Sequence, residues 1–176
     1  MKHIITISLI LAGLALPLAA QILPSSPVDP AVDGSFGATE YPQVVQLKDM
    51  RLGYALSRNG QSLHFILEAP ATGWVSVGLG SNRMHGAHMI IGYDALSSQV
   101  ISEETGRGHG HSPSSTKLLI QSTIKESGGK TTLEFSLPAS TYSSGKELPL
   151  IVAYGTQDNL RSKHKRYDSH TIAFQK

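Results

Sequence analysis

The feature that most constrains the fold is a series of short apolar runs, each separated from the next by turn-forming residues. In one run Leu63 and Phe65 share a face while His64 and Ile66 share the other, the period-2 pattern of a β-strand with one buried side. Asn-Gly and Gly-Gly pairs, which are typical of hairpin turns, lie between such runs. The runs lie at residues 44–47, 50–57, 62–68, 74–79, 88–93, 100–102, 118–124, 131–137, 148–154 and 171–174. With no convincing helical period after residue 20, the pattern predicts an all-β chain folded as an antiparallel β-sandwich.

The N-terminal residues have the features of an export signal. Lys2 and His3 precede an apolar stretch at residues 4–18, and Ala19-Ala20 offers small residues for cleavage. We therefore expect a signal peptide at 1–20, a flexible Pro- and Ser-containing leader at 21–30, and a single domain at 31–176. The alternative is a buried N-terminal helix. Export predicts a secreted or periplasmic protein, and without a second long apolar run the mature chain is not expected to be an integral membrane protein.

Charge and composition exclude several classes of function. The chain has 15 basic and 13 acidic residues, so loss of Lys2 leaves a net charge of about +1, which argues against a nucleic-acid partner. There is no Cys, which excludes disulfides, iron–sulfur clusters and covalently attached c-type haem. No Ser-centred nucleophile motif occurs, and the His-x-x-His at 85–88 lacks the Glu of a zinc protease. We therefore predict no enzymatic activity, and we interpret the adjacent Glu103-Glu104 as a strand end.

The first candidate site is the polar loop at residues 80–87, which lies between two predicted strands. Met84 and His85 lie at its tip, and His88 begins the following strand. A thioether and imidazoles on a glycine-containing loop suit a soft metal or a haem iron. The alternative is a solvent-exposed turn without a ligand.

Two further places concentrate unusual residues. His109 and His111 lie in a Gly-rich loop and, with His85 and His88, form a weaker copper or zinc candidate in which Met84 is a soft ligand. The other interpretation of this loop is surface histidines that bind nothing. His164 lies in a basic run at 161–166, which is either a solvated turn or part of a haem site whose cations contact the propionates. Arg83 is placed to have the same role.

The ordered motifs resemble the DOMON domain, the β-sandwich family that includes the b-type cytochrome domain of cellobiose dehydrogenase. The resemblance spans about residues 31–174 and rests on Asp33-Gly34 with Glu40-Tyr41, on APATGWVSVG at 69–78, on MHGAHMIIGY at 84–93, and on AYG at 153–155 followed by Asp158 and KHKR at 163–166. Two departures occur. His88 stands where the family usually has Asp, and the loop at 110–114 lacks the family's acidic residue.

The resemblance implies an immunoglobulin-like sandwich with non-covalent haem b, in which Met84 and His164 are the axial ligands of the iron. Trp74, Met89 and Tyr154 are expected to wall the macrocycle. With both axial positions filled, electron transfer is expected, with a redox partner protein or a quinone-linked membrane reductase as partner. The alternatives are a haem-free module that binds a sugar or a protein, and a periplasmic copper- or zinc-binding protein.

Overall fold

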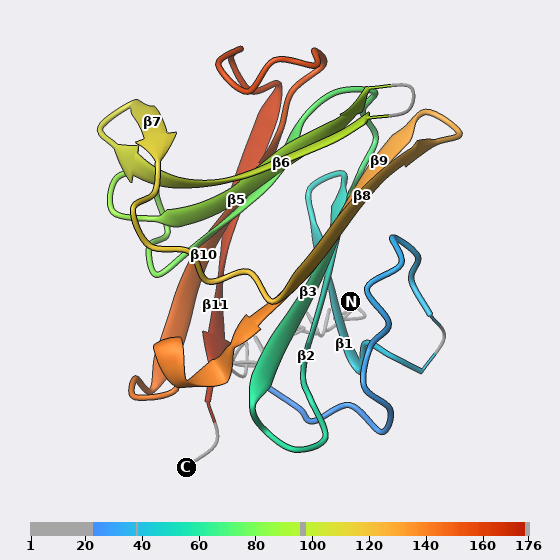
Figure 1. Ribbon diagram of the computed structural model, residues 1–176, viewed down its shortest axis with the longest axis vertical. Helices are drawn as coiled ribbons and strands as arrows, with labels where there is room; N and C mark the ends of the chain where they lie inside the picture. The colour runs from blue at the N-terminus through green and yellow to red at the C-terminus, as the bar shows by residue number, and fades with distance from the viewer. Residues whose placement is uncertain (1–22, 38, 96–97, 175–176) are drawn as a thin grey trace, which may run out of the picture.

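The computed structural model describes residues 23–37, 39–95 and 98–174. In this part the chain forms two antiparallel sheets that pack face to face, with one short 3₁₀ turn, η1 (Ala139–Thr141) (Figure 1). The five-stranded sheet has the order β1-β2-β3-β9-β8, and the six-stranded sheet has the order β11-β10-β4-β5-β6-β7. The strands are β1 (Gln43–Leu47), β2 (Met50–Leu56), β3 (Ser62–Ala69), β4 (Val75–Leu79), β5 (His88–Ala95), β6 (Ser98–Arg107), β7 (Gly110–Pro113), β8 (Gln121–Ser127), β9 (Lys130–Pro138), β10 (Glu147–Tyr154) and β11 (Arg166–Ala173).

The prediction of an all-β sandwich is confirmed. The expected signal peptide lies outside the described residues. Within the described residues no helix is long and apolar enough to span a membrane.

The core lies between the two sheets and is supplied by alternate residues of their strands. Phe65 of β3 stacks on Phe135 of β9 with ring centroids 5.3 Å apart, and both side chains are fully buried. Val75 and Val77 face them from β4, and Val152 does so from β10. Removing such side chains from water drives the two inner faces together, at about 1.5–3 kcal/mol for each large apolar side chain.

The outer face of the five-stranded sheet is also covered, contrary to the sequence interpretation of β3. Ile66 and His64, expected on a polar face, have only 0% and 6% of their surfaces exposed. The segment before β1 lies over this face, where Phe36 and Tyr41 pack with Ile66. The alternation was assigned correctly, but the second face meets protein and not solvent.

A buried carboxylate fastens this covering segment to the sheet. Glu134 of β9 is fully buried and accepts hydrogen bonds from the Asp33 and Gly34 amides, at 2.8 and 2.6 Å, and from the Tyr41 hydroxyl at 2.5 Å. Burial raises the pKa of Glu134, and the three donors oppose that shift. The Asp-Gly and Glu-Tyr motifs of the sequence are thus the two parts of the chain that this carboxylate holds.

Residues 23–30 are docked, which differs from the flexible leader that their Pro and Ser content predicts. The amide of Leu23 donates to the Ala173 carbonyl at 2.8 Å, and Ser26 and Leu56 are joined by a backbone hydrogen bond of the same length. Leu23 is also part of the core. The segment is ordered because its backbone groups pair with the ends of β2 and β11 and its apolar side chain is buried.

We predict that Tyr41→Phe lowers the free energy of unfolding by about 1–3 kcal/mol, because it removes a buried hydrogen bond to the Glu134 carboxyl group. Urea denaturation measures the loss. Tyr167→Phe is the matched control, since the Tyr167 side chain is exposed, and its effect should stay within about 0.5 kcal/mol. Equal stabilities of the two variants would contradict the role assigned to Glu134.

Candidate functional site

A small apolar floor lies on the outer face of the six-stranded sheet, separate from the core between the sheets. Met89 and Ile91 of β5 point away from the core because their neighbour Ile90 points into it. Only 5% of Met89 and 0% of Ile91 are exposed, and neither belongs to the two core clusters. Apolar side chains on the outer face of a sandwich are buried only when something else covers them. Two loops next to this face, β4–β5 and β10–β11, carry the two predicted ligands.

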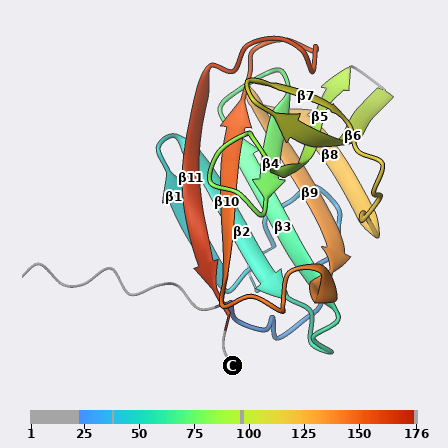
Figure 2. The ribbon, with the colours of Figure 1, turned by 90° about the vertical axis from the view of Figure 1, so that its left-hand side faces the viewer.

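The first loop joins β4 to β5 and carries Met84. It leaves β4 with the Gly80 amide bonded to the Pro149 carbonyl at 2.9 Å and then turns back over the sheet, where it lies in front of β4 and β10 in Figure 2. A Cβ on Gly106 of β6 would lie 1.8 Å from the Met84 carbonyl oxygen, so this close approach requires glycine. Met84 is half-buried against the outer face.

The second loop joins β10 to β11 and carries His164. The Trp74 indole, which is 5% exposed, donates to the Ser162 hydroxyl at 2.8 Å. The half-buried His164 ring lies edge-to-face on Tyr167, with centroids 5.0 Å apart. Tyr167 is paired with Ala153, an outward-facing residue of β10, and its ring also lies 5.1 Å from the ammonium of Lys48 in the β1–β2 turn, so His164 lies at the β11 edge of the six-stranded sheet.

The two loops begin from opposite ends of β10. Gly80 is bonded to Pro149 near one end of β10, and the Lys165 amide donates to the Tyr154 carbonyl at the other. Five residues of strand separate these points by about 17 Å. The outer face between the loops therefore has a methionine loop on one side and a histidine loop on the other.

A buried ionic cluster ties the His164 loop to the edge of the sheet. Glu104 of β6 is 2% exposed, and its carboxylate lies 3.0 Å from Nδ1 of His111 and 3.5 Å from Nη1 of Arg161. Arg161 also donates to the His111 carbonyl. Arg161 comes from the β10–β11 loop, so the cluster joins that loop to β6 and β7. Burying a carboxylate such as that of Glu104 costs free energy unless nearby groups balance its charge and donate hydrogen bonds to it.

The adjacent acid, Glu103, points to the opposite face and has a different histidine as its partner. Its Oε2 lies 3.0 Å from Nε2 of His88 and accepts the Leu118 amide at 2.6 Å. Burial, followed by the nearby Glu103 charge, raises the pKa of Tyr142 to about 12. The interpretation of Glu103-Glu104 as a strand end was wrong, because both acids lie within β6 and are buried on its two faces. The sequence signal that was missed is that two adjacent residues of a strand point to opposite faces, so Glu103 and Glu104 can each pair with a different histidine, His88 and His111.

The histidines of the copper or zinc candidate are not brought together. His88 lies on the inner face with Glu103 and His111 on the outer face with Glu104, while Nδ1 of exposed His85 accepts the Gly108 amide at 3.0 Å. His109 is exposed. Among the residues that the structure describes, no group of three His, Asp or Glu side chains is arranged to hold a metal ion.

Of the remaining predicted residues, Tyr154 is the one that lies elsewhere. Its ring is fully buried in the core between the sheets, and its hydroxyl donates to Asp49 at 2.7 Å. The alternation along β10 that makes Ala153 face outward makes Tyr154 face inward, so it cannot wall a group held on the outer face. Arg83 is exposed beside Met84. Met89 is part of the apolar floor, and Trp74 contacts the loop that carries His164.

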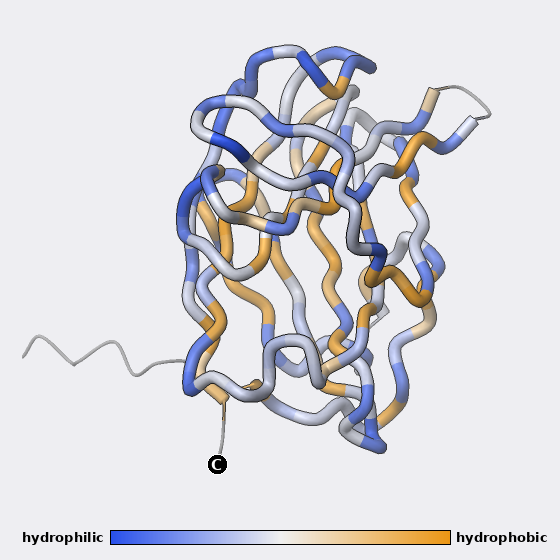
Figure 3. The backbone as a smooth tube through the Cα atoms, turned by 60° about the vertical axis from the view of Figure 1, so that its left-hand side comes forward, coloured by the Kyte–Doolittle hydropathy of each residue, from blue (hydrophilic) through white to orange (hydrophobic). Residues whose placement is uncertain are grey.

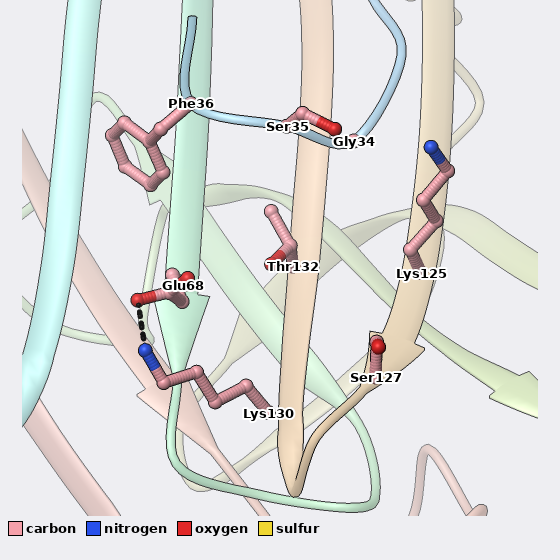
Figure 4. A pocket seen from close by; sticks show the side chains of 8 residues that line it. All are labelled: Gly34, Ser35, Phe36, Glu68, Lys125, Ser127, Lys130 and Thr132. Atoms are coloured by element: carbon pink, nitrogen blue, oxygen red, sulfur yellow. Dashed lines mark hydrogen bonds and ion pairs between the residues drawn. The ribbon is translucent and has the colours of Figure 1, made fainter.

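A separate pocket of about 440 Å³ lies on the five-stranded sheet. Glu68 and Lys130, joined by an ion pair at 2.9 Å, line one side, and Lys125 lies on the other beneath the segment that contains Ser35 (Figure 4). Thr132 lies between them in this view. Hydroxyl and ammonium groups of this kind can donate hydrogen bonds to an oxygen-rich small molecule. None of the residues expected to hold haem lines this pocket.

The fold and the order of its strands define the class of protein, an antiparallel β-sandwich of two sheets. The family model of the DOMON domain matches residues 46–154, and the chain belongs to that family. The chain is similar in structure to the cytochrome b domain of pyranose dehydrogenase from Coprinopsis cinerea, with a TM-score of 0.56, 16% identity, and coverage of 71% of this chain and 76% of that one. It is also similar to the cytochrome domain of Myriococcum thermophilum cellobiose dehydrogenase, with a TM-score of 0.54, 11% identity, and coverage of 76% and 81%. No curated protein sequence matches the chain.

We predict that Arg161→Met increases amide hydrogen exchange in residues 156–165. The substitution removes the ion pair with Glu104 and the hydrogen bond to His111. For a half-exposed guanidinium this lowers the free energy of opening the loop by about 1 kcal/mol, which corresponds to roughly fivefold faster exchange. Hydrogen exchange with mass spectrometry measures the change. Arg58→Met, at an exposed turn far from this loop, is the matched control. Unchanged exchange in the loop would show that the ionic cluster does not hold it.

Proposed function

We propose that the outer face between the two loops binds non-covalent haem b, with Met84 and His164 as axial ligands, and that the protein is an exported electron carrier. The observation that carries the proposal is the apolar floor of Met89 and Ile91, which is buried outside the core and flanked by these two loops. The similarity of the fold to cytochrome domains supports a haem-binding module of this kind. The absence of Cys requires that any haem be held without covalent links.

The residues present fit such a group. The Ser76 hydroxyl, whose strand position gives it the same outward direction as Gly78, is buried and has no hydrogen-bond partner among the described residues. An orphaned polar atom of this kind marks a place where a further group is expected. The exposed cations Arg83 and Lys163, which neighbour the two proposed ligands in the sequence, are available to two propionates.

Bound haem supplies reversible one-electron chemistry, and the chain's own residues set its limits. A thioether from one loop and an imidazole from the other leave no open position for a substrate, which favours outer-sphere electron transfer and argues against an enzymatic role. Met89, Ile91 and Trp74 exclude water from the floor. The Glu104–His111–Arg161 cluster holds the loop that carries His164. A redox protein or a quinone-linked membrane reductase is the expected partner, and the N-terminal sequence supports export to the periplasm or the exterior.

We predict that the haem-loaded chain has the sharp reduced spectrum of a six-coordinate, low-spin haem. Met84→Ala and His164→Ala should each abolish that spectrum, because each removes one axial ligand. Visible spectroscopy of the reduced protein measures this. His109→Ala is the control and should leave the spectrum unchanged. A low-spin spectrum that survives both ligand substitutions would reject these ligands.

A further inference from the structure

Charge is unevenly distributed along the chain, and its cations are concentrated in the loops around the two proposed ligands. Residues 80–87, 106–111 and 155–166 together contain six Lys and Arg and one acidic residue, Asp158. The whole chain has 15 basic and 13 acidic residues, which leaves nine basic and twelve acidic residues elsewhere. A protein with a net charge of only +2 therefore has one strongly basic region and an acidic remainder.

The three segments are linked to one another on the outer side of the six-stranded sheet. The Gly108 amide donates to Nδ1 of His85 at 3.0 Å, which joins the β6–β7 turn to the β4–β5 loop. Arg161 donates to the His111 carbonyl, which joins the β10–β11 loop to β7. Figure 3 shows hydrophilic residues along the loops at the top of the sandwich, above apolar strands.

Four of the six cations are free to act on an approaching molecule. Arg161 is occupied by Glu104, and Nε of Arg166 lies 3.0 Å from Asp49. The other four are exposed and form no ion pair with a described residue; we call them the basic rim, and they are Arg83, Arg107, Lys163 and Lys165. Arg83 and Lys163 are also the cations proposed for the haem propionates, and Lys165 lies 5.9 Å from the Tyr154 ring centroid, but none of the four charges is neutralised by a carboxylate of the described residues.

We propose that the basic rim is the docking surface for an acidic patch on a redox partner protein. The inference rests on the proposed electron-transfer function, because the rim residues lie in the loops around the two proposed ligands. A compact partner with a local acidic patch can meet the rim while avoiding the acidic remainder. A long polyanion or an extended anionic membrane would also meet that remainder and be repelled by it.

Exposed charges of this kind act chiefly on the rate of encounter. They steer an oppositely charged partner and orient it, while adding little to the lifetime of the complex. A carrier that must bind and release its partner at every turnover benefits from that combination. The interaction must weaken as salt screens the charges, over a Debye length of about 8 Å at physiological ionic strength.

Reduction of the haem-loaded chain by two protein probes of opposite charge tests the proposal. Reduced plant-type ferredoxin, an acidic protein, passes one electron to the ferric haem; in the reverse direction the ferrous haem passes one electron to mitochondrial cytochrome c, a basic protein. We expect the second-order rate constant with ferredoxin to fall about tenfold or more between about 20 and about 300 mM ionic strength. The rate constant with cytochrome c should not fall. A ferredoxin rate that is independent of salt would overturn the proposal.

Charge reversal with a matched control locates the effect. Arg107→Glu combined with Lys165→Glu, which spares the two cations assigned to the propionates, should slow ferredoxin about tenfold at low salt, and Arg107→Glu alone provides a second variant should the first not fold. Arg58→Glu combined with Lys146→Glu changes the net charge equally at exposed positions outside the three loops, and should change the rate less than about twofold. Equal slowing by the control would mean that net charge, and not the rim, governs the encounter.

A measurement without haem separates this proposal from the proposed function. Ferredoxin is titrated into the ¹⁵N-labelled, haem-free chain, and amide shifts are recorded by NMR. Shift changes confined to the three loops, and lost at high salt, support the rim even in a chain that takes up no haem. Shift changes elsewhere, or none, overturn it, whereas failure to take up haem overturns the proposed function alone.

Discussion

The structure depends on burial of the outer faces of both sheets, which a β-sandwich does not need for its own stability. The inner faces alone make a core from alternate residues of the strands. Here Ile66 on one outer face and Ile91 on the other are also removed from water. An apolar outer face has to be covered, because exposure of each such side chain costs about 1.5–3 kcal/mol. The segments that cover the two faces therefore determine what this sandwich does beyond folding.

The two outer faces use the same device, a buried carboxylate that binds the covering segment. Glu134 holds the segment before β1 through backbone amides and the Tyr41 hydroxyl, and Glu104 holds the β10–β11 loop through His111 and Arg161. Burying a carboxylate is unfavourable unless it is well matched, so each acid specifies the geometry of its covering segment more than it adds stability. On the five-stranded sheet the result is that the segment before β1 is held against the outer face. On the six-stranded sheet it is a loop held beside an apolar floor.

The strands could be predicted because short apolar runs, such as the alternating residues 62–68, are separated by turn residues, and the family motifs placed Met84 and His164 in two loops. What could not be predicted depends on contacts between distant segments. Tyr154 is aromatic and lies within a family motif, yet the alternation of β10 directs its side chain into the core. Glu103 and Glu104 looked like a polar strand end because their histidine partners lie on other strands. β7 was missed because a Gly- and His-containing turn has no apolar alternation, and its pairing with β6 comes from backbone hydrogen bonds.

The central claim is that the Met84 sulfur is an axial ligand of an iron held over the outer face of the six-stranded sheet. Proton–carbon NMR of the reduced, haem-loaded chain, with ¹³C in the methionine methyl groups, tests it directly. A methyl group directly above a porphyrin ring is shifted far upfield by the ring current. The account predicts one such resonance among the four methionines of the chain, absent in Met84→Leu. A chain that binds haem while the Met84 methyl keeps an ordinary chemical shift would contradict it.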